Sequence, residues 1–242
     1  MAVEKWMDLN GKVVIVTGGS QGIGEHVVQN LRANNAFVVV ADLRINENFI
    51  EKYGKIDAIV NNAGVSRPRM LVDYYGQKPE YELTEDDLDF MYNVNQKGVV
   101  LCAQAVAREM IKQKSGVIIN LSSQAGIHGS KGQSAYSGTK AAVHSYTMAW
   151  AKELGPFNIR VVGVAPDVNE RTPMNNDAAF EALAYTRGTD PKNTTDDYTK
   201  TIPLGRPGKL DEVADLIAYL VSDHSSYITG TTINISGGKS CN

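Results

Sequence analysis

The sequence predicts an α/β fold, a single domain built on a doubly wound parallel β-sheet. Short apolar runs that suit strands alternate with longer helical patterns along the chain. The strand-like runs are continuously apolar, which is typical of parallel strands that helices cover on both faces. A glycine-rich turn separates the first run from the first helical pattern. The length of 242 residues and the hydrophobic content of 43% suit one large domain.

Six segments are expected as strands because they are short, apolar and rich in β-branched residues. They are residues 13–16, 37–41, 58–60, 116–121, 159–164 and 231–235. Helical periodicity predicts helices at residues 25–34, 88–112, 135–154 and 211–220. Right-handed crossovers between such strands would place helices on both faces of the sheet.

Residues 167–203 differ from the rest of the chain because they are polar and show little periodicity, apart from a helical pattern at residues 178–185. A long segment of this kind near a strand end is more often a lid than a second domain. We therefore expect one dinucleotide-binding domain over residues 1–242, with a substrate lid at residues 167–203.

Composition and charge exclude several functions. The net charge is −3 with no block of like charges, so neither nucleic acid nor an anionic membrane is an expected partner. The two cysteines, Cys102 and Cys241, provide neither a disulfide framework nor a metal-ligand spacing, and we expect no metal. Residues 1–11 lack an apolar signal core and no run approaches ~18 apolar residues, which predicts a cytoplasmic protein.

Three glycines, Gly18, Gly22 and Gly24, follow the first expected strand. Glycine lets the chain turn tightly and lets backbone N–H groups approach a pyrophosphate at the start of the next helix. The spacing Gly-x-x-x-Gly-x-Gly is weak on its own, and an ordinary strand-to-helix turn is the alternative. Its place after the first strand, with Asp42 ending the second, indicates a Rossmann-type dinucleotide site. The intervening residues expected to contact the cofactor are Ser20, Gln21 and Ile23.

Asp42 lies 18 residues after Gly24. A carboxylate at this place accepts both ribose hydroxyls of NAD and repels the 2′-phosphate of NADP. Ser20 and Gln21 provide no cation for that phosphate, whereas Arg44 would soften the discrimination. The charges therefore favour NAD as the cofactor, and a solvated turn residue is the alternative for Asp42.

Tyr136 and Lys140 are four residues apart in the expected helix 135–154, so their side chains share one face. The pKa of tyrosine is near ~10, and a neighbouring ammonium favours the phenolate and lowers that value. Bringing the pKa to ~7 takes about 4 kcal/mol. Such a tyrosine can donate a proton to an alkoxide as hydride arrives, and can reverse the step. The spacing alone would also fit a pair on a helix surface.

Ser123 follows the expected strand 116–121 and lies thirteen residues before Tyr136. Open α/β sheets bind ligands at strand ends, so the Ser123 hydroxyl would hold a substrate carbonyl and share the developing charge. Ser122 is the neighbouring candidate, and a serine in a polar loop is the alternative for either. Gln124 would contact substrate hydroxyls.

These motifs together resemble the short-chain dehydrogenase/reductase family over about residues 9–238. The resemblance depends on motifs that occur in the family's order: Thr17-Gly-x-x-x-Gly-x-Gly24, Asn61-Asn-Ala-Gly64, Asn95, Ser123, Tyr136-x-x-x-Lys140 and Ala165-Pro166. The family implies a seven-stranded Rossmann sheet, and a homo-oligomer that is usually a tetramer or dimer.

The resemblance also implies roles for individual residues. Tyr136 would be the general acid/base, Lys140 would lower its pKa and bind the nicotinamide ribose, and Ser123 would position the carbonyl. Asn95 would hold a water molecule in a proton relay. The other implied cofactor contacts are Asn62, Ala63 and Gly64 beside the adenosine half, and Pro166, Val168 and Thr172 toward the nicotinamide.

Two departures from the family pattern matter. Asp167 follows Pro166 where the family usually has glycine, which brings a Cβ and a charge to the nicotinamide pocket. The span from Asp42 to Asn61 has room for one short helix, so the third strand of the family is missing. A deletion and omitted residues both fit this span. A deletion would leave the second strand as an exposed edge and would weaken the adenine site.

Weaker similarities point to a branch of the family that acts on sugar alcohols and their phosphates. They lie at residues 67–73, 81–83, 95–99, 129–134 and 160–166. A substrate phosphate needs cations, and a bidentate arginine suits it. The candidates are Arg67, Arg69 and Lys131, with solvated surface charge as the alternative for each.

Three functions remain open. The favoured one is hydride transfer between NAD and a secondary alcohol or ketone, with a polyol or polyol phosphate as the small-molecule substrate. A 3-oxoacyl thioester reductase or steroid-type reductase would prefer NADP and a basic patch, which Asp42 and the net acidity oppose. A non-catalytic nucleotide-binding protein would fit the missing strand but leaves Ser123, Tyr136 and Lys140 unexplained.

Overall fold

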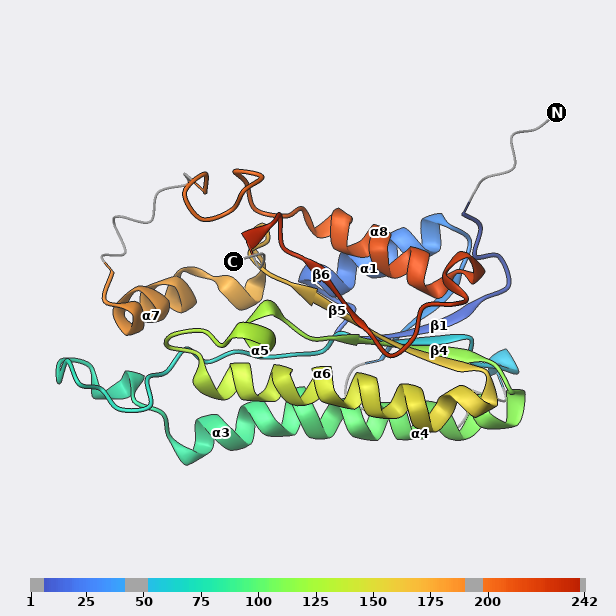
Figure 1. The fold of residues 1–242 in the computed structure, drawn as a ribbon, viewed down its shortest axis with the longest axis horizontal. Coiled ribbons are helices and arrows are strands. Elements are labelled where there is room, and N and C mark those ends of the chain that lie inside the picture. The colour runs from blue at the N-terminus through green and yellow to red at the C-terminus, as the bar shows by residue number, and fades with distance from the viewer. Residues whose placement is uncertain (1–6, 42–51, 190–197, 240–242) are drawn as a thin grey trace.

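The computed structural model describes residues 7–41, 52–189 and 198–239. Within these residues, parallel strands form a six-stranded sheet in the order β2-β1-β3-β4-β5-β6. The strands are β1 Val13–Thr17, β2 Phe37–Ala41, β3 Ala58–Asn61, β4 Gly116–Leu121, β5 Ile159–Pro166 and β6 Thr232–Ile235. The predicted doubly wound parallel sheet of one domain is confirmed (Figure 1).

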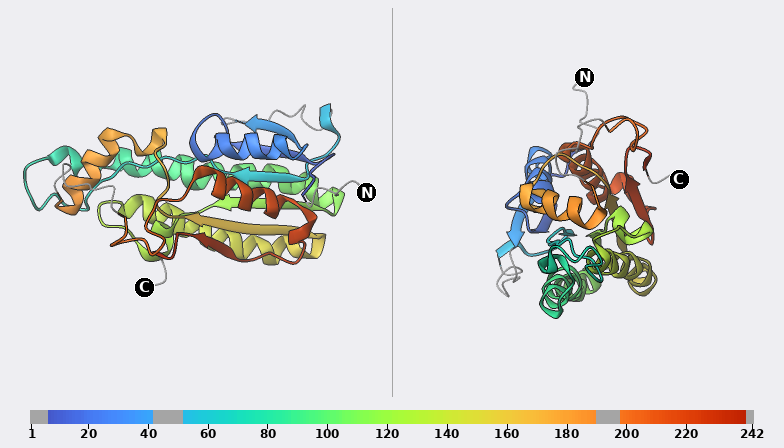
Figure 2. Two further views of the ribbon diagram at one scale, coloured as in Figure 1. Left: turned by 90° about the horizontal axis from the view of Figure 1, so that it is seen from above. Right: turned by 90° about the vertical axis from the view of Figure 1, so that its left-hand side faces the viewer.

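Helices cover both faces of this sheet. They are α1 Gly22–Ala33, α3 Glu85–Tyr92, α4 Val99–Gln113, α5 Gln124–His128, α6 Ser134–Leu154, α7 Asp177–Arg187 and α8 Leu210–Val221. Helices α1 and α8 lie side by side over one face, whereas α3, α4 and α6 lie on the other (Figures 1 and 2). Helix α7 stands beyond the carboxyl ends of the strands, near α5 (Figure 1). In the described part of the chain, no helix combines the length and apolarity that crossing a membrane requires.

Strand β1 shows why continuously apolar segments form this architecture. All five of its residues are buried. Val14 and Val16 pack in the core beneath α1 and α8, whereas Val13 and Ile15 pack in the second core, with α4. Successive side chains of a strand point to opposite faces, so one apolar run contributes to both cores.

Strand β2 forms one edge of the described sheet and pairs with β1, Val13 opposite Phe37. Phe37 is 61% exposed and Val40 is 36% exposed. The third strand that the family implies is not found among the described residues, and residues 42–51 lie outside them. The expected exposure of β2 at the edge is therefore observed.

The single helix expected at residues 88–112 is a composite of three segments. Helix α3 begins at Glu85, where Thr84 and Asp87 form a capping box. A π-helical segment, η2 (Asn93–Gly98), then joins α3 to α4. The prediction missed this interruption because apolar residues continue at helical spacing on both sides of it. Short π-helical segments of this kind often occur at functional sites.

Candidate active site

A cleft of about 1660 Å³ opens where β1, β3, β4 and β5 end, the usual ligand-binding edge of such a sheet. Most residues expected to contact the cofactor line it: Gly18, Ser20, Gln21, Gly22, Ile23, Asn62, Ala63, Gly64, Tyr136, Lys140, Pro166, Val168 and Thr172. Gly24 lies behind the lining rather than in it. Asp42 and Arg44, on which the choice between NAD and NADP depends, lie outside the described residues.

The turn between β1 and α1 has the shape that a dinucleotide pyrophosphate needs. A Cβ on Gly24 would stand 2.1 Å from the Gly18 carbonyl oxygen, so a side chain there would displace the turn. Gly22 has a φ of +56°, a backbone conformation that favours glycine. Among the described residues, no side chain caps α1 at Gln21. The first N–H groups of α1 are therefore available to an anion in the cleft.

Asn62 supports this turn from the neighbouring strand. Its side-chain amide donates to the carbonyl oxygens of Thr17 and Gly18, each at 3.0 Å. The Thr17 hydroxyl in turn accepts from the backbone N–H groups of Asn62 at 3.1 Å and Ala63 at 3.0 Å. The segment Asn61–Gly64 therefore fixes the end of β3 against the glycine turn. The Asn62 side chain holds the wall of the cleft, while the adenosine contact remains a prediction.

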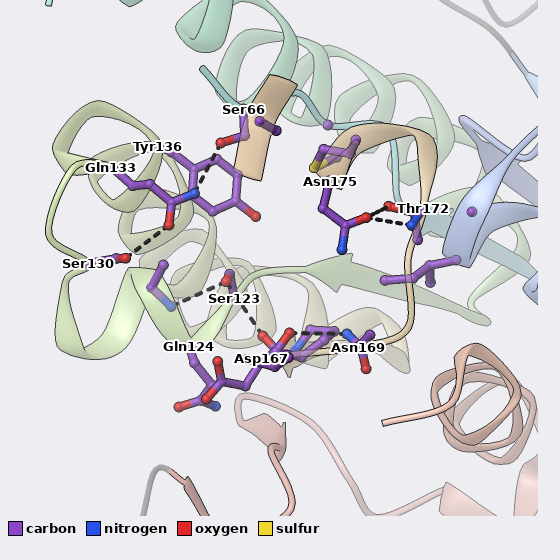
Figure 3. Close-up of a pocket in the computed structure, with 18 of the residues that line it drawn as sticks. Ser66, Ser123, Gln124, Ser130, Gln133, Tyr136, Asp167, Asn169, Thr172 and Asn175 are labelled. Atoms are coloured by element: carbon purple, nitrogen blue, oxygen red, sulfur yellow. Dashed lines mark hydrogen bonds between the residues drawn. The ribbon is translucent and has the colours of Figure 1, made fainter. Parts of the chain in front are cut away.

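Tyr136 and Ser123 come together in the cleft (Figure 3), and Lys140 also lines it. Both Tyr136 and Lys140 are on α6, and the Lys140 Nζ lies 5.9 Å from the centroid of the Tyr136 ring. A hydrogen bond joins the side chains of Ser123 and Tyr136. The Ser122 hydroxyl instead donates to the Lys140 carbonyl oxygen at 2.9 Å and is buried. The geometry therefore favours Ser123 over Ser122 as the group beside Tyr136.

The pKa of Tyr136 differs from the expectation. Burial raises it above the usual value near 10, and the hydrogen bond from Ser123 only partly offsets that effect. Burial also lowers the pKa of Lys140 to about 8. The predicted lowering of the Tyr136 pKa by Lys140 is therefore not found in the protein alone, because desolvation of the phenolate is the largest effect on this group.

Asn95 lies in the π-helical segment η2 and does not line the cleft. Its amide donates to the Val65 carbonyl oxygen at 2.8 Å and to the Thr139 hydroxyl at 3.0 Å, and its carbonyl accepts from the Val65 N–H at 2.8 Å. A Cβ placed on Gly64 would lie 3.3 Å from the Lys140 Nζ and 3.4 Å from the Asn95 Oδ1. Asn95 thus fixes the backbone next to Lys140, and the water relay remains a prediction.

The structure does not bring the three predicted phosphate-binding residues to the cleft. Arg67 and Arg69 each form an ion pair of 3.0 Å with Asp87. Lys131 donates to the Arg187 carbonyl oxygen at 3.1 Å. The reason is Asp87, which is 3% exposed and needs a charged partner because burying a lone carboxylate is costly. The sequence did not indicate that this carboxylate folds back onto the arginines.

Polar side chains line the substrate end of the cleft, and the sequence analysis singled out Asp167 among them but not Ser66, Ser130 or Gln133. Gln133 donates to Ser66 Oγ at 3.2 Å and accepts from Ser130 at 2.9 Å (Figure 3). Asp167, a departure from the family pattern, forms a 3.1 Å ion pair with Lys239. The loops that carry Ser66, Ser130 and Gln133 lack periodicity, so the sequence analysis did not place these side chains in the cleft.

Gln124, which was expected to contact substrate hydroxyls, also lines the cleft. It is 4% exposed, and its amide nitrogen donates to the Ala165 carbonyl oxygen at 3.1 Å. Its Oε1 is buried and has no hydrogen-bond partner among the described residues. This oxygen has almost no accessible surface, so a ligand could reach it only after the side chain moved, and the contact with substrate hydroxyls remains a prediction.

Comparisons with known proteins agree with this geometry. A family model described as enoyl-(acyl carrier protein) reductase matches residues 44–240. Sorbitol-6-phosphate 2-dehydrogenase from Klebsiella pneumoniae is 45% identical, over 97% of this chain and 98% of the relative. The chain belongs to the short-chain dehydrogenase/reductase family. It is an oxidoreductase that acts on CH–OH groups with a nicotinamide cofactor.

Other members of the short-chain dehydrogenase/reductase family show that similar chains differ in substrate. A 3-oxoacyl-[acyl-carrier-protein] reductase from Thermotoga maritima is 37% identical over 96% of this chain and 99% of the relative. The structure of an NAD⁺-bound xylitol dehydrogenase has a TM-score of 0.85 at 27% identity, covering 95% of this chain and 99% of that one. A 3-ketoacyl-(acyl-carrier-protein) reductase from Brucella melitensis has a TM-score of 0.80 at 26% identity, covering 96% and 100%.

The K. pneumoniae relative also bears on the short span between β2 and β3. Its alignment covers 261 positions, which is more than the 242 residues of this chain. The relative therefore has residues without a counterpart here. That difference in length agrees with the short span between β2 and β3, where the described residues contain no third strand of the family.

Proposed function

We propose that this short-chain dehydrogenase/reductase is an NAD-dependent dehydrogenase of a sugar alcohol phosphate, of the type that converts sorbitol 6-phosphate to fructose 6-phosphate. The observation that carries the proposal is the polar lining of the cleft near Tyr136, where the side chains of Ser66, Ser130 and Gln133 are joined by hydrogen bonds. Such a lining suits the hydroxyl groups of a polyol better than an apolar acyl chain. The higher identity to the sorbitol-6-phosphate relative than to the acyl reductase supports the same choice.

In oxidation, Tyr136 accepts the proton of the reacting hydroxyl, and in reduction it donates that proton to the forming alkoxide. Ser123, hydrogen-bonded to Tyr136, holds the oxygen that carries the developing charge. The charged Lys140 stabilises the phenolate form of Tyr136 and binds the nicotinamide ribose, and Asn95 holds the water of the relay. The nicotinamide, when bound, accepts or supplies the hydride. Residues 167–203, of which 190–197 lie outside the described part of the chain, are proposed as the substrate lid of a homo-oligomeric enzyme, with Val168 and Thr172 toward the cofactor.

The preference for NAD depends on charge near the adenosine ribose. Ser20 and Gln21 line the cleft and bring no cation to a 2′-phosphate. Asp42 is proposed to accept the ribose hydroxyls. Asp42→Ala should narrow the ratio of kcat/KM with NAD to that with NADP, whereas Asp86→Ala, at an exposed position, should leave the ratio unchanged. If the ratio of kcat/KM with NAD to that with NADP is the same in the Asp42 variant and the unmodified enzyme, Asp42 does not determine the preference for NAD.

A second candidate function is reduction of a 3-oxoacyl thioester, which the 37% identical relative from T. maritima favours. The two functions are separated by measuring absorbance at the reduced-nicotinamide band. NAD is supplied with sorbitol, xylitol, sorbitol 6-phosphate or a 3-hydroxyacyl thioester. We expect the largest kcat/KM with sorbitol 6-phosphate. Faster turnover of the thioester would establish the second function, and NADH binding without turnover of any substrate would contradict both.

A further inference from the structure

Among the described residues, one cationic side chain of the cleft outside the proton-transfer group has no ion-pair partner. The arginines and lysines that line the cleft are Lys140, Arg171, Arg187, Arg206 and Lys239. Arg171, Arg206 and Lys239 form ion pairs with Asp177, Glu212 and Asp167. Lys140 belongs to the proton-transfer group. Among the residues that the structure describes, no carboxylate forms an ion pair with Arg187.

Arg187 is held in place without its charge being neutralised. It is the last residue of α7, and its Nη2 donates to the Ser130 hydroxyl at 3.2 Å. Its Nε donates to the Lys131 carbonyl oxygen at 3.5 Å, and its own carbonyl oxygen accepts from the Lys131 Nζ at 3.1 Å. A guanidinium has five N–H donors, so three of them remain for a ligand in the cleft.

The electrostatic surroundings of Arg187 favour an anion. Arg187 is exposed to solvent at the end of α7, and partial desolvation lowers the pKa of its guanidinium while the charge of Asp167 partly offsets that shift. Asp167 is already paired with Lys239 at 3.1 Å. The group of Arg187, Lys239 and Asp167 therefore carries one net positive charge at the edge of the cleft. A bound anion would supply the charge that Arg187 lacks.

A polar path leads from Arg187 toward the proton-transfer residue. Ser130, the partner of Arg187, donates to Gln133 at 2.9 Å, and Gln133 donates to Ser66 at 3.2 Å (Figure 3). Gln133 precedes α6, which carries Tyr136. All of these residues line the cleft. A substrate with its reacting carbon at Tyr136 and an anion at Arg187 would lie along hydroxyl and amide groups.

We propose that Arg187 is the specificity-determining residue that binds the substrate's phosphate group, a proposal that rests on the proposed function. The guanidinium can take two phosphate oxygens in a bidentate contact, while Ser130 keeps it in position. The assignment replaces Arg67, Arg69 and Lys131, whose side chains are committed elsewhere.

The test compares Arg187→Gln with the unmodified enzyme, using sorbitol 6-phosphate and sorbitol with NAD. We expect kcat/KM for sorbitol 6-phosphate to fall roughly 10- to 100-fold, the loss of one charge-assisted hydrogen-bonding contact. The value for sorbitol should stay within about twofold. Arg206→Gln is the matched control, because this arginine also lines the cleft but is already paired with Glu212. An equal fall for both substrates, or no fall for either, overturns the proposal.

A second measurement separates this inference from the proposed function. The dissociation constant of inorganic phosphate is measured by isothermal titration calorimetry on the NAD-bound enzyme and on Arg187→Gln. Weaker phosphate binding in the variant supports the subsite even if no polyol phosphate is turned over, in which case the proposed function alone fails. Equal phosphate binding in the two proteins overturns the inference even if sorbitol 6-phosphate is the substrate.

Discussion

The Nζ of Lys140 donates a 2.7 Å hydrogen bond to the carbonyl oxygen of Leu121, at the end of the strand that leads to Ser123. Lys140 is 4% exposed. Its side chain therefore extends from α6 to the neighbouring strand β4 and brings a positive charge into the protein interior. A buried charge of this kind opposes folding and is retained only where something else requires it.

We expect Lys140→Met to abolish turnover and to raise the free energy of unfolding. Burial lowers the pKa of Lys140 to about 8, against about 10.4 in the unfolded chain, so the charged form costs about 3 kcal/mol of stability below pH 8. Replacing Lys140 also removes its bond to the Leu121 carbonyl oxygen, which lowers the free energy of unfolding by about 1 kcal/mol. The net gain at pH 7 should be about 2 kcal/mol, measured by urea unfolding.

The sign of the pH dependence tests the same point. Between pH 8 and about 10.4 the folded protein releases the Lys140 proton before the unfolded chain does, so the unmodified protein gains stability as pH rises. The advantage of Lys140→Met should therefore shrink from pH 7 to pH 10. A variant less stable than the unmodified protein at pH 7 would contradict the cost assigned to the buried ammonium.

Tyr136→Phe should lower kcat at least about 100-fold, because general acid/base catalysis contributes that much or more. The dissociation constant for NADH, followed by fluorescence titration, should change little since the ring remains in the cleft wall. Tyr146→Phe is the matched control, as Tyr146 is also on α6 and bonds to Gln96 instead. Substantial turnover by the Tyr136 variant would remove this tyrosine from the proton step.

Arg67→Ala and Arg69→Ala should each destabilise the protein by about 1.5–3 kcal/mol, because each removes a charge-assisted bond to the buried Asp87. Neither should change the ratio of kcat/KM for sorbitol 6-phosphate to that for sorbitol. The stability loss is measured by urea unfolding at pH 7. A fall in kcat/KM for sorbitol 6-phosphate but not for sorbitol, in either variant, would show that these arginines bind the phosphorylated substrate.

Acid should weaken the ion pairs of Asp87 with Arg67 and Arg69. Burial favours the neutral form of Asp87, but the bonds from Arg67 and Thr84 and the charge of Arg69 together hold its pKa below the ordinary value near 3.8. The stabilisation is therefore present above about pH 4 and is lost as pH falls through the folded-state pKa. Unmodified protein and Arg69→Ala should approach equal stability in acid.

Tyr185→Phe should raise the KM for the polyol phosphate several-fold with a smaller effect on kcat. The Tyr185 hydroxyl donates to Asp73 at 2.8 Å and accepts from the Lys78 N–H at 3.0 Å. These bonds fasten α7, and with it Arg187, to the loop between β3 and α3. Tyr227→Phe, at a 99% exposed position, is the control. An unchanged KM would mean that α7 stays in place without this anchor.

The sequence predicted the sheet and the catalytic group because both follow from short-range rules. Val13–Thr17 is buried on both faces of the sheet, and the spacing of the glycines that follow it restricts the turn to few backbone conformations. The four-residue spacing of Tyr136 and Lys140 places them on one helical face wherever that helix lies. Helix α7 was predicted at residues 178–185 and is observed at Asp177–Arg187.

The remaining features depend on contacts between distant segments. The positions of Arg67 and Arg69 follow from Asp87, a partner that periodicity does not reveal. The raised pKa of Tyr136 follows from burial, which the spacing of Tyr136 and Lys140 does not measure. Arg187 became a candidate only when α7 was seen to end at the cleft.

The π-helical segment Asn93–Gly98 means that the α3–α4 rod contains one residue more than a regular helix would need. If the same residues were wound as a regular α-helix, α3 would be rotated by roughly 100° relative to α4. The side-chain amide of Asn95, which bonds to the Val65 backbone, would then point away from that segment. The π-helical segment therefore lets α3 and α4 face different neighbours. A regular helix would leave the cleft wall beside Lys140 without the support of Asn95.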